Sequence, residues 1–255
     1  MIVQPLRVAV TREEPPDGPL ATALHRHGLT PVPCPAIAEA PPPDPEPLRR
    51  AALALDEYQW LVVASARAVR ALLEARRGRG LPEGLRTAAV GTRTAAALVA
   101  AGALDPLTAR VAGSEPLVAS LRDAEAWPGR RVLLPRALEG GSELGSALRA
   151  WRARVDEVVA YRTLERPPDE IATAWRRAAP DAAVVGSPSA ARALVRGVGV
   201  DELRRVEPLV AIGSPTAMEL VGRGVKARVP PRADFEAIAE MLALGSRAGE
   251  EVAAP

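Results

Sequence analysis

Aromatic residues, cysteine, histidine and lysine are all scarce in this sequence. Only 3% of its 255 residues are aromatic, and it has one cysteine, two histidines and a single lysine, Lys226. A lone cysteine, Cys34, cannot form a disulfide within the chain, which favours a reducing compartment and a packed thiol. His25 and His27 are two residues apart on a predicted helix, so they face different directions. No Cys/His cluster or carboxylate set has the spacing of a metal site, and we expect none.

Long apolar runs and cofactor motifs are also missing. No run approaches the roughly 18 apolar residues that a membrane-spanning helix needs, and the N-terminus lacks a signal-peptide pattern. No Walker sequence occurs, and Gly140–Gly145 departs from the dinucleotide-binding Gly-x-Gly-x-x-Gly pattern. The net charge of +2 is too small to indicate a nucleic-acid partner. We therefore expect a cytoplasmic protein without a cofactor, bound to neither membrane nor nucleic acid, and a monomer by default.

What the sequence does contain is a duplicated pattern. Three pairs of segments share residues and order: 60–72 with 182–194, 89–95 with 211–217, and 7–12 with 131–136. In the first two pairs the second member lies 122 residues after the first, and the third pair has nearly the same offset. Self-similarity on this scale indicates two copies of one domain, and two similar lobes leave a cleft for a ligand.

Each copy alternates short apolar runs with helical patterns. The apolar runs predict strands at Leu61–Ala64, Thr87–Val90, Val132–Leu134, Ala182–Val185 and Leu209–Ile212. Ala, Leu and Arg at helical spacing predict helices at Ala66–Arg77, Thr92–Ala101, Ser142–Arg154, Ser189–Arg196 and Pro215–Gly222. Uniformly apolar strands alternating with helices indicate an α/β fold with parallel sheets covered on both faces.

The repeat units are permuted, which predicts how the chain is connected. The third unit of the second copy lies at the N-terminus, in residues 7–28. One lobe therefore combines residues 1–35 with 167–255, and the other is residues 36–166. The chain crosses between lobes near 30–40 and 155–166, where Ile37 corresponds to Tyr161. We expect these crossings to pair as a two-stranded β-ladder that forms a hinge.

Small and hydroxyl-bearing residues follow four of the predicted strands. They are Ser65, Gly91–Thr94, Ser187–Ser189 and Gly213–Thr216. In open parallel sheets ligands bind beyond the carboxyl ends of the strands, where helices begin and their backbone N–H groups favour anions. The plainer interpretation is that these residues are ordinary helix caps. Four equivalent junctions directed into one cleft would instead form an anion-binding site.

Tyr161 is the one residue outside these junctions with an evident chemical use. It is one of two tyrosines and lies in the second predicted hinge strand. A phenol there could donate a hydrogen bond to a leaving oxygen. A tyrosine packed at a domain junction is the alternative. Tyr58, which precedes a strand, has no such placement.

Taken together, these patterns resemble one enzyme family. Six short segments occur in the order 7–12, 60–66, 89–95, 158–163, 185–190 and 211–217. Their ordered set is similar to uroporphyrinogen-III synthase over nearly the whole chain. The resemblance implies two α/β lobes joined by a two-stranded ladder. It also implies a reaction of tetrapyrrole biosynthesis, the cyclisation of hydroxymethylbilane to uroporphyrinogen III with inversion of the last pyrrole ring, without metal or cofactor.

The resemblance assigns roles to individual residues. Tyr161 matches the tyrosine thought to assist departure of the substrate hydroxyl. We assign binding of the carboxylate-rich substrate to the matching positions Arg12, Ser65, Thr94, Ser187 and Thr216. The helix starts add Gly91, Ser189 and Gly213 to this set. Ala64 and Gly186 depart from the family pattern, which usually has threonine at both positions. These departures remove hydroxyls but leave the backbone amides.

Two other functions fit parts of the sequence. A non-catalytic, synthase-like domain that binds a tetrapyrrole or serves a regulator is mildly favoured by Ala64 and Gly186. A two-lobed binding protein for another anionic metabolite fits the cleft equally well but not the set of motifs. The isomer formed from hydroxymethylbilane separates the enzyme, which yields isomer III, from both alternatives, which leave the spontaneous isomer I.

Overall fold

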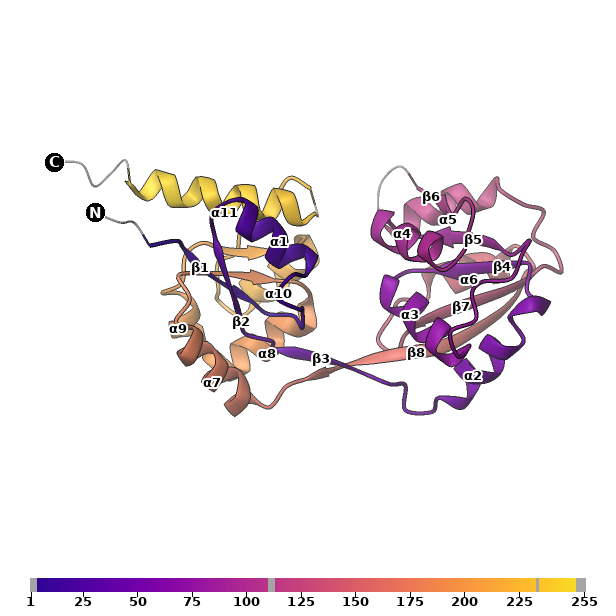
Figure 1. Ribbon diagram of the computed structural model, residues 1–255, viewed down its shortest axis with the longest axis horizontal. Helices are drawn as coiled ribbons and strands as arrows, with labels where there is room; N and C mark the ends of the chain where they lie inside the picture. The colour runs from indigo at the N-terminus through magenta and orange to yellow at the C-terminus, as the bar shows by residue number, and fades with distance from the viewer. Residues whose placement is uncertain (1–3, 110–112, 233, 251–255) are drawn as a thin grey trace. The chain divides into compact units, whose positions relative to one another are not determined.

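The computed structural model describes residues 4–109, 113–232 and 234–250 (Figure 1). The chain divides into two compact units. Unit 1 comprises Met1–Glu39 and Leu164–Pro255, and unit 2 is Ala40–Thr163. Each unit has a sheet of parallel strands with helices on both faces, so the predicted α/β class with parallel sheets is confirmed.

Unit 1 contains four parallel strands in the order β10-β9-β1-β2. They are β1 (Arg7–Val10), β2 (Thr30–Pro33), β9 (Ala182–Val185) and β10 (Leu209–Ala211). Helices α7 (Pro168–Ala178), α8 (Pro188–Val198), α9 (Val200–Leu203) and α10 (Ser214–Gly222) cover one face. Helices α1 (Pro19–Arg26) and α11 (Phe235–Glu250) cover the other face (Figure 1). Alternate strand residues enter the two cores, so each strand is apolar throughout.

Unit 2 has the same plan, and the longer sheet that lies mostly within it has the order β3-β8-β7-β4-β5-β6. Its strands are β3 (Ile37–Ala40), β4 (Trp60–Val63), β5 (Arg86–Ala89), β6 (Leu107–Thr108), β7 (Arg131–Ala137) and β8 (Arg154–Glu165). Helices α2 (Glu46–Leu53), α3 (Ala66–Ala75) and α4 (Thr92–Ala100) cover one face. Helices α5 (Ser114–Arg122) and α6 (Glu143–Ala150) cover the other, and a 3₁₀ turn spans Leu55–Glu57. The chain passes from one unit to the other within β3 and within β8.

The five predicted strands and five predicted helices all form, with ends within a few residues of those expected. One correction concerns residues 30–40, which the sequence predicted to be a single crossing. Residues 30–33 instead form β2, which pairs in parallel with β1 in the sheet of unit 1, and only 37–40 form the separate strand β3. The physical reason is that the N–H groups of Thr30 and Cys34 find acceptors in or just before β1.

The edge strand β2 is protected by its prolines. The N–H groups of Thr30 and Cys34 donate toward β1, and backbone groups alternate in direction along a strand, so the odd-numbered residues have theirs on the outer edge. These outward residues include Pro31 and Pro33, and Pro35 follows in the same phase. Because proline has no N–H, the outer edge of β2 offers no donor to a further strand, and the sheet of unit 1 ends there.

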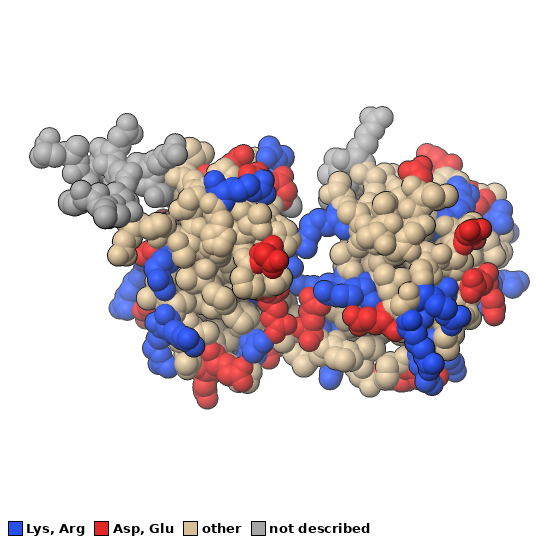
Figure 2. All heavy atoms as spheres, in the orientation of Figure 1, with Lys and Arg blue, Asp and Glu red and all other residues tan. Residues whose placement is uncertain are grey.

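Acidic and basic side chains are intermixed on the visible face of each unit (Figure 2). Many arginines are paired with carboxylates. Glu157 accepts from Arg136 at 3.3 Å and from Arg149 at 2.9 Å, and Glu219 accepts from Arg223 at 2.7 Å and from Arg192 at 3.3 Å. Hydrogen bonding by Arg223 lowers the pKa of the Glu219 carboxyl. The arginine-rich composition therefore reflects many local ion pairs.

Arg76 is a buried arginine whose removal should weaken unit 2. Its guanidinium donates to the carbonyl of Ala52 at 2.7 Å and to the carbonyls of Arg79 and Gly80 at 3.4 and 3.2 Å. Arg76→Ala leaves these carbonyls without their donor and should lower the free energy of unfolding by about 2–4 kcal/mol. Urea unfolding followed by tryptophan fluorescence measures this loss. Arg79→Ala, at an exposed position, is the control, and an equal effect of the two changes would contradict the assignment.

Cys34 should be unreactive in the folded protein. Its side chain is fully buried, and this burial raises the pKa of the thiol to about 12. At pH 8 the thiol is therefore protonated, and the thiolate is the form that alkylating reagents attack. We expect no alkylation by iodoacetamide at pH 8 within an hour in the native state and complete alkylation in urea, measured by mass spectrometry. Rapid labelling of native protein would show that Cys34 is accessible.

Candidate active site

Each unit has one point where the order of its strands reverses direction, and such points are where open α/β sheets bind ligands. In unit 2, β5 and β7 lie on opposite sides of β4, so the switch lies between β4 and β7. In unit 1, β2 and β9 lie on opposite sides of β1. Ser65 follows β4 and Arg12 follows β1. Two of the predicted site residues thus lie beside the switch points of their own units.

The register of the strands in unit 2 aligns several predicted site residues. Val63 pairs with Ala89 across β4 and β5, so two residues further on Ser65 is level with Gly91. On its other side β4 pairs with β7, through Trp60 with Val132 and Leu61 with Leu133. Further along β7, Ala137 pairs with Tyr161 on β8. Gly91, Ser65 and Tyr161 thus form a row at the carboxyl edge of the sheet, in which the Ser65 and Tyr161 hydroxyls are 3.1 Å apart.

Ser65 connects two parts of this row. It is the N-cap of α3, and its Oγ accepts the N–H of Ala68 at 3.2 Å. The same Oγ lies 3.1 Å from the phenol oxygen of Tyr161, within hydrogen-bond distance. Tyr161 is half-buried and packs against the core beneath α2, α3 and α4. The sequence predicted both residues as site residues but gave no sign that they touch, because they come from different strands.

The two glycine junctions share one geometry. Gly91 caps α4, and its carbonyl accepts the N–H groups of Thr94 and Ala95, both at 3.0 Å. Gly213 caps α10, and its carbonyl accepts the N–H groups of Thr216 and Ala217, both at 3.1 Å. The side chains of Thr94 and Thr216 are buried, at 6% and 3% exposure. The residues of these junctions that lie nearer the surface are therefore the ones before the threonines, Gly91–Arg93 and Gly213–Pro215.

In unit 1 the site residues follow β1, β9 and β10. Ser187 caps α8 as Ser65 caps α3, and its Oγ accepts the N–H of Ala190 at 3.2 Å. The Ser187 Oγ also lies 3.0 Å from the Oγ of Ser189. Val185 pairs with Ala211, so Ser187 is level with Gly213. The row in unit 1 thus repeats that in unit 2, with a serine where unit 2 has Tyr161 as the hydroxyl partner.

Arg12 is held among side chains of unit 1. Its Nε lies 3.3 Å from Oε2 of Glu14, and its guanidinium carbon lies 5.5 Å from the centre of the Phe235 ring. Glu14 also accepts the N–H groups of Leu20 and Ala21, at 2.5 and 3.0 Å. The loop after β1 thus holds an arginine fixed beside Glu14, which in turn accepts the N–H groups at the start of α1.

Sequence reasoning missed two residues at the switch points. Thr11 is buried, and its Oγ1 donates to the carbonyl of Val184 at 2.8 Å, which joins β1 to β9. Arg136, at the end of β7, donates through Nη1 to the carbonyls of Ala137, Leu138 and Gly140 at 3.0, 3.2 and 3.2 Å. Thr11 directly follows β1, and Arg136 is the last residue but one of β7. Both lie in the repeated segments 7–12 and 131–136, and that repeat was the signal that could have identified them.

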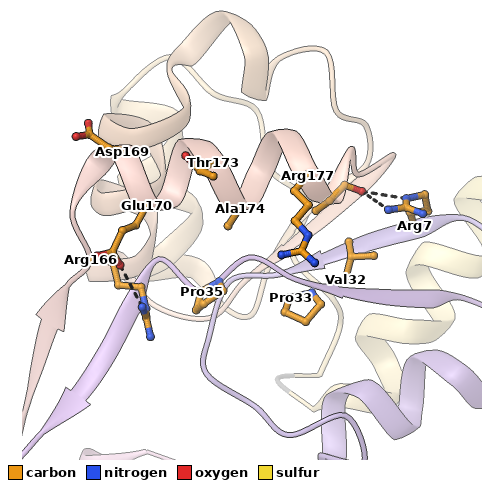
Figure 3. Close-up of a pocket in the computed structure, with 11 residues that line it drawn as sticks. Arg7, Val32, Pro33, Pro35, Arg166, Asp169, Glu170, Thr173, Ala174 and Arg177 are labelled. Atoms are coloured by element: carbon orange, nitrogen blue, oxygen red, sulfur yellow. Dashed lines mark hydrogen bonds and ion pairs between the residues drawn. The ribbon is translucent and has the colours of Figure 1, made fainter.

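Figure 3 shows a pocket of about 810 Å³ in unit 1, between α7 and the outer edge of β2. Its charged lining is mixed, with Arg7, Arg166, Arg177, Asp169 and Glu170, and Val32 and Pro33 are part of its apolar lining. Arg7 is fixed there because the carbonyl of Ala178 accepts from its Nε and Nη2, at 2.9 and 2.5 Å. No predicted site residue lines this pocket, so the candidate site rests on the rows at the strand ends.

Within residues 4–109, 113–232 and 234–250, no three His, Cys, Asp or Glu side chains are grouped as metal ligands. In the same described part of the chain, no helix has the length and apolar character required to cross a bilayer.

Comparison with known proteins identifies the family. The family described as uroporphyrinogen-III synthase HemD matches residues 18–240. A uroporphyrinogen-III synthase from Synechococcus elongatus is 31% identical over 241 residues, covering 88% of this chain and 90% of the relative.

Solved structures share the fold. A mutant uroporphyrinogen III synthase from Thermus thermophilus superimposes with a TM-score of 0.60 at 24% identity, covering 96% of this chain and 99% of that one. The Helicobacter pylori enzyme also gives a TM-score of 0.60, at 19% identity over 95% of this chain and all of that one. The family matches most of the length of this chain, and the motif residues at the strand ends occur in the family's order. The chain therefore belongs to the uroporphyrinogen-III synthase family.

Proposed function

We propose that this chain is a cyclising lyase that closes linear hydroxymethylbilane into uroporphyrinogen III, inverting the last pyrrole ring. The observation that carries the proposal is the family match over residues 18–240, together with 31% identity to a synthase over 88% of the chain. The row of Gly91, Ser65 and Tyr161 gives the reaction a chemical centre in unit 2.

Binding of the substrate relies on the backbone of the helix starts. Hydroxymethylbilane carries acetate and propionate carboxylates, and the first-turn N–H groups of a helix are suited to carboxylates by both hydrogen bonding and the helix dipole. The helices that begin at Ser65, Gly91, Ser187 and Gly213 supply such groups. Ala64 and Gly186 leave this set intact, because replacing a threonine side chain does not remove a backbone amide.

Tyr161 acts on the hydroxyl that leaves. Its phenol donates a proton to the hydroxyl oxygen, the carbon–oxygen bond breaks with the electron pair going to oxygen, and water departs. The electron pair of the pyrrole nitrogen stabilises the resulting azafulvene. The last ring then attacks through its substituted carbon, and the carbon skeleton rearranges to the inverted ring. The proton released when that ring regains aromaticity restores the phenol, so the net change is the loss of one water.

Control of geometry is the larger part of catalysis. Without an enzyme the substrate closes to the uninverted isomer I, so the protein has to direct which carbon attacks. Holding several carboxylates at once fixes the fold of the substrate. Arg12, beside the switch point of unit 1, is assigned to this binding role. Two points remain predictions from the sequence. One is that a single substrate spans both rows, and the other is that the lobes close around it about a two-stranded hinge.

The alternative is a synthase-like domain that binds a tetrapyrrole without turning it over. Ala64 and Gly186 favour it, because each stands at a strand end where the family usually has a threonine hydroxyl. Incubation with freshly made hydroxymethylbilane, followed by oxidation and separation of the uroporphyrin isomers, decides between the two. Isomer III in excess over a protein-free control is the expected result. Isomer I alone, together with tight tetrapyrrole binding, would establish the alternative.

Tyr161→Phe should be the most damaging single hydroxyl removal. It takes away the proton donor while keeping the ring that packs on the core, and kcat for isomer III should fall by about 100-fold, the lower range for general acid catalysis. Stopped assays with isomer separation measure this rate.

Tyr58→Phe is the matched control for this change. Tyr58 donates to Asp156 at 2.7 Å, and burial together with this hydrogen bond raises its pKa to about 12. Its phenol is thus engaged elsewhere in unit 2, and the variant should turn over at the wild-type rate. Equal rates for Tyr161→Phe and the wild type would remove Tyr161 from the mechanism.

A further inference from the structure

We infer that Ser65 is a positioning residue for Tyr161, which it holds as a proton donor toward the leaving hydroxyl. The inference rests on the proposed function and assigns Ser65 a task distinct from holding a carboxylate. Its starting observation is the 3.1 Å separation between the Ser65 Oγ and the Tyr161 phenol oxygen. Both residues belong to unit 2, so the arrangement depends on that unit alone.

Either hydroxyl can be the donor in this hydrogen bond, and the proposal assigns the donor role to Ser65. A serine hydroxyl has one proton and can accept two hydrogen bonds, and a phenol also has one proton. The Ser65 Oγ already accepts the N–H of Ala68, which uses one lone pair. When Ser65 donates its proton to the phenol oxygen, the phenol proton of Tyr161 is left for the substrate. The opposite direction would consume the phenol proton inside the protein.

The backbones of both residues are fixed, so the hydrogen bond can direct the phenol. Ser65 is the N-cap of α3, with an extended backbone (φ −149°, ψ 146°). Tyr161 pairs with Ala137 just after an irregularity in the pairing of β7 with β8, where Ala160 of β8 is the extra residue, and its carbonyl accepts the N–H of Leu138 at 2.9 Å. The ring of Tyr161 packs against the core. Rotation of the phenol O–H is the freedom that remains, and Ser65 restricts it.

The internal repeat provides a natural comparison. Ser187 caps α8 with the same 3.2 Å bond to the amide three residues later, but its hydroxyl partner is Ser189. Ile37, the repeat counterpart of Tyr161, has no hydroxyl. Ser65 and Ser187 thus share a capping role, and the hydrogen bond to a phenol belongs to Ser65. Any effect of Ser65→Ala that Ser187→Ala does not reproduce reports on that bond.

The consequences differ from those of a binding residue. Removing the hydroxyl of a carboxylate ligand raises KM, whereas loss of positioning lowers kcat because the donor is oriented for less of the time. We expect Ser65→Ala to lower kcat by about tenfold with KM within about twofold of wild type. Ser65→Thr keeps a hydroxyl at an extended N-cap position and should restore kcat to within about threefold of wild type.

A double-mutant cycle on the full chain tests the inference. The variants are Ser65→Ala, Tyr161→Phe and the double variant, with kcat and KM measured for isomer III formation. We expect Ser65→Ala to have less than a twofold further effect on kcat once Tyr161 is phenylalanine, because there is no phenol proton left to orient. In contrast, Ser187→Ala combined with Tyr161→Phe should multiply the separate effects. Thermal unfolding of Ser65→Ala and Ser187→Ala checks that the two variants lose a similar amount of stability when the helix cap is removed.

The outcomes separate the inference from the proposed function. Wild-type protein that forms isomer III, with a Ser65→Ala effect that persists undiminished in Tyr161→Phe, would overturn the positioning role while leaving the synthase assignment in place. A rise in KM with unchanged kcat in Ser65→Ala would likewise return Ser65 to substrate binding. Wild-type protein that yields only isomer I would overturn the proposed function itself.

Discussion

The parallel register of the strands is the constraint on which the rest of the structure depends. Because parallel strands all end at one edge, every following helix begins at that edge and presents its first-turn amides there. In unit 2 the register also brings Gly91, Ser65 and Tyr161 to one level, although they follow or lie on three different strands. The proposed anion binding and the proposed proton transfer thus both depend on how the strands pair.

Duplication has produced two rows with a common backbone and different side chains. Ser65 and Ser187 cap their helices with the same geometry, and Gly91 and Gly213 accept the same pair of amides. The rows differ in the partner of the serine hydroxyl, which is a phenol in unit 2 and Ser189 in unit 1. In the proposed mechanism the shared backbone features bind the substrate, and the feature found in one copy performs the chemistry.

The central elements were predictable because local pattern and tertiary environment agree there. Strands β4 and β9 are four-residue apolar runs buried at every position, followed by a serine cap and an alanine-rich helix. The periphery was less predictable. Strand β2 alternates proline with other residues, a pattern that local preference assigns to extended crossing chain. Residues 30–33 become a strand because they pair with β1. Their prolines are tolerated because β2 lies at the edge of the sheet, where no further strand needs their missing N–H groups.

The sequence by itself determined the family, the parallel α/β class and the helix caps at Ser65 and Ser187, because these depend on residues close together in the chain or on motifs in a fixed order. It also predicted Tyr161 as the candidate catalytic residue. The tertiary structure decided which of these residues meet. The hydrogen bond between Ser65 and Tyr161 joins residues 96 positions apart, and that between Thr11 and Val184 joins residues 173 apart. Such pairs are set by strand order and register, which the packing of whole sheets determines and no local pattern specifies.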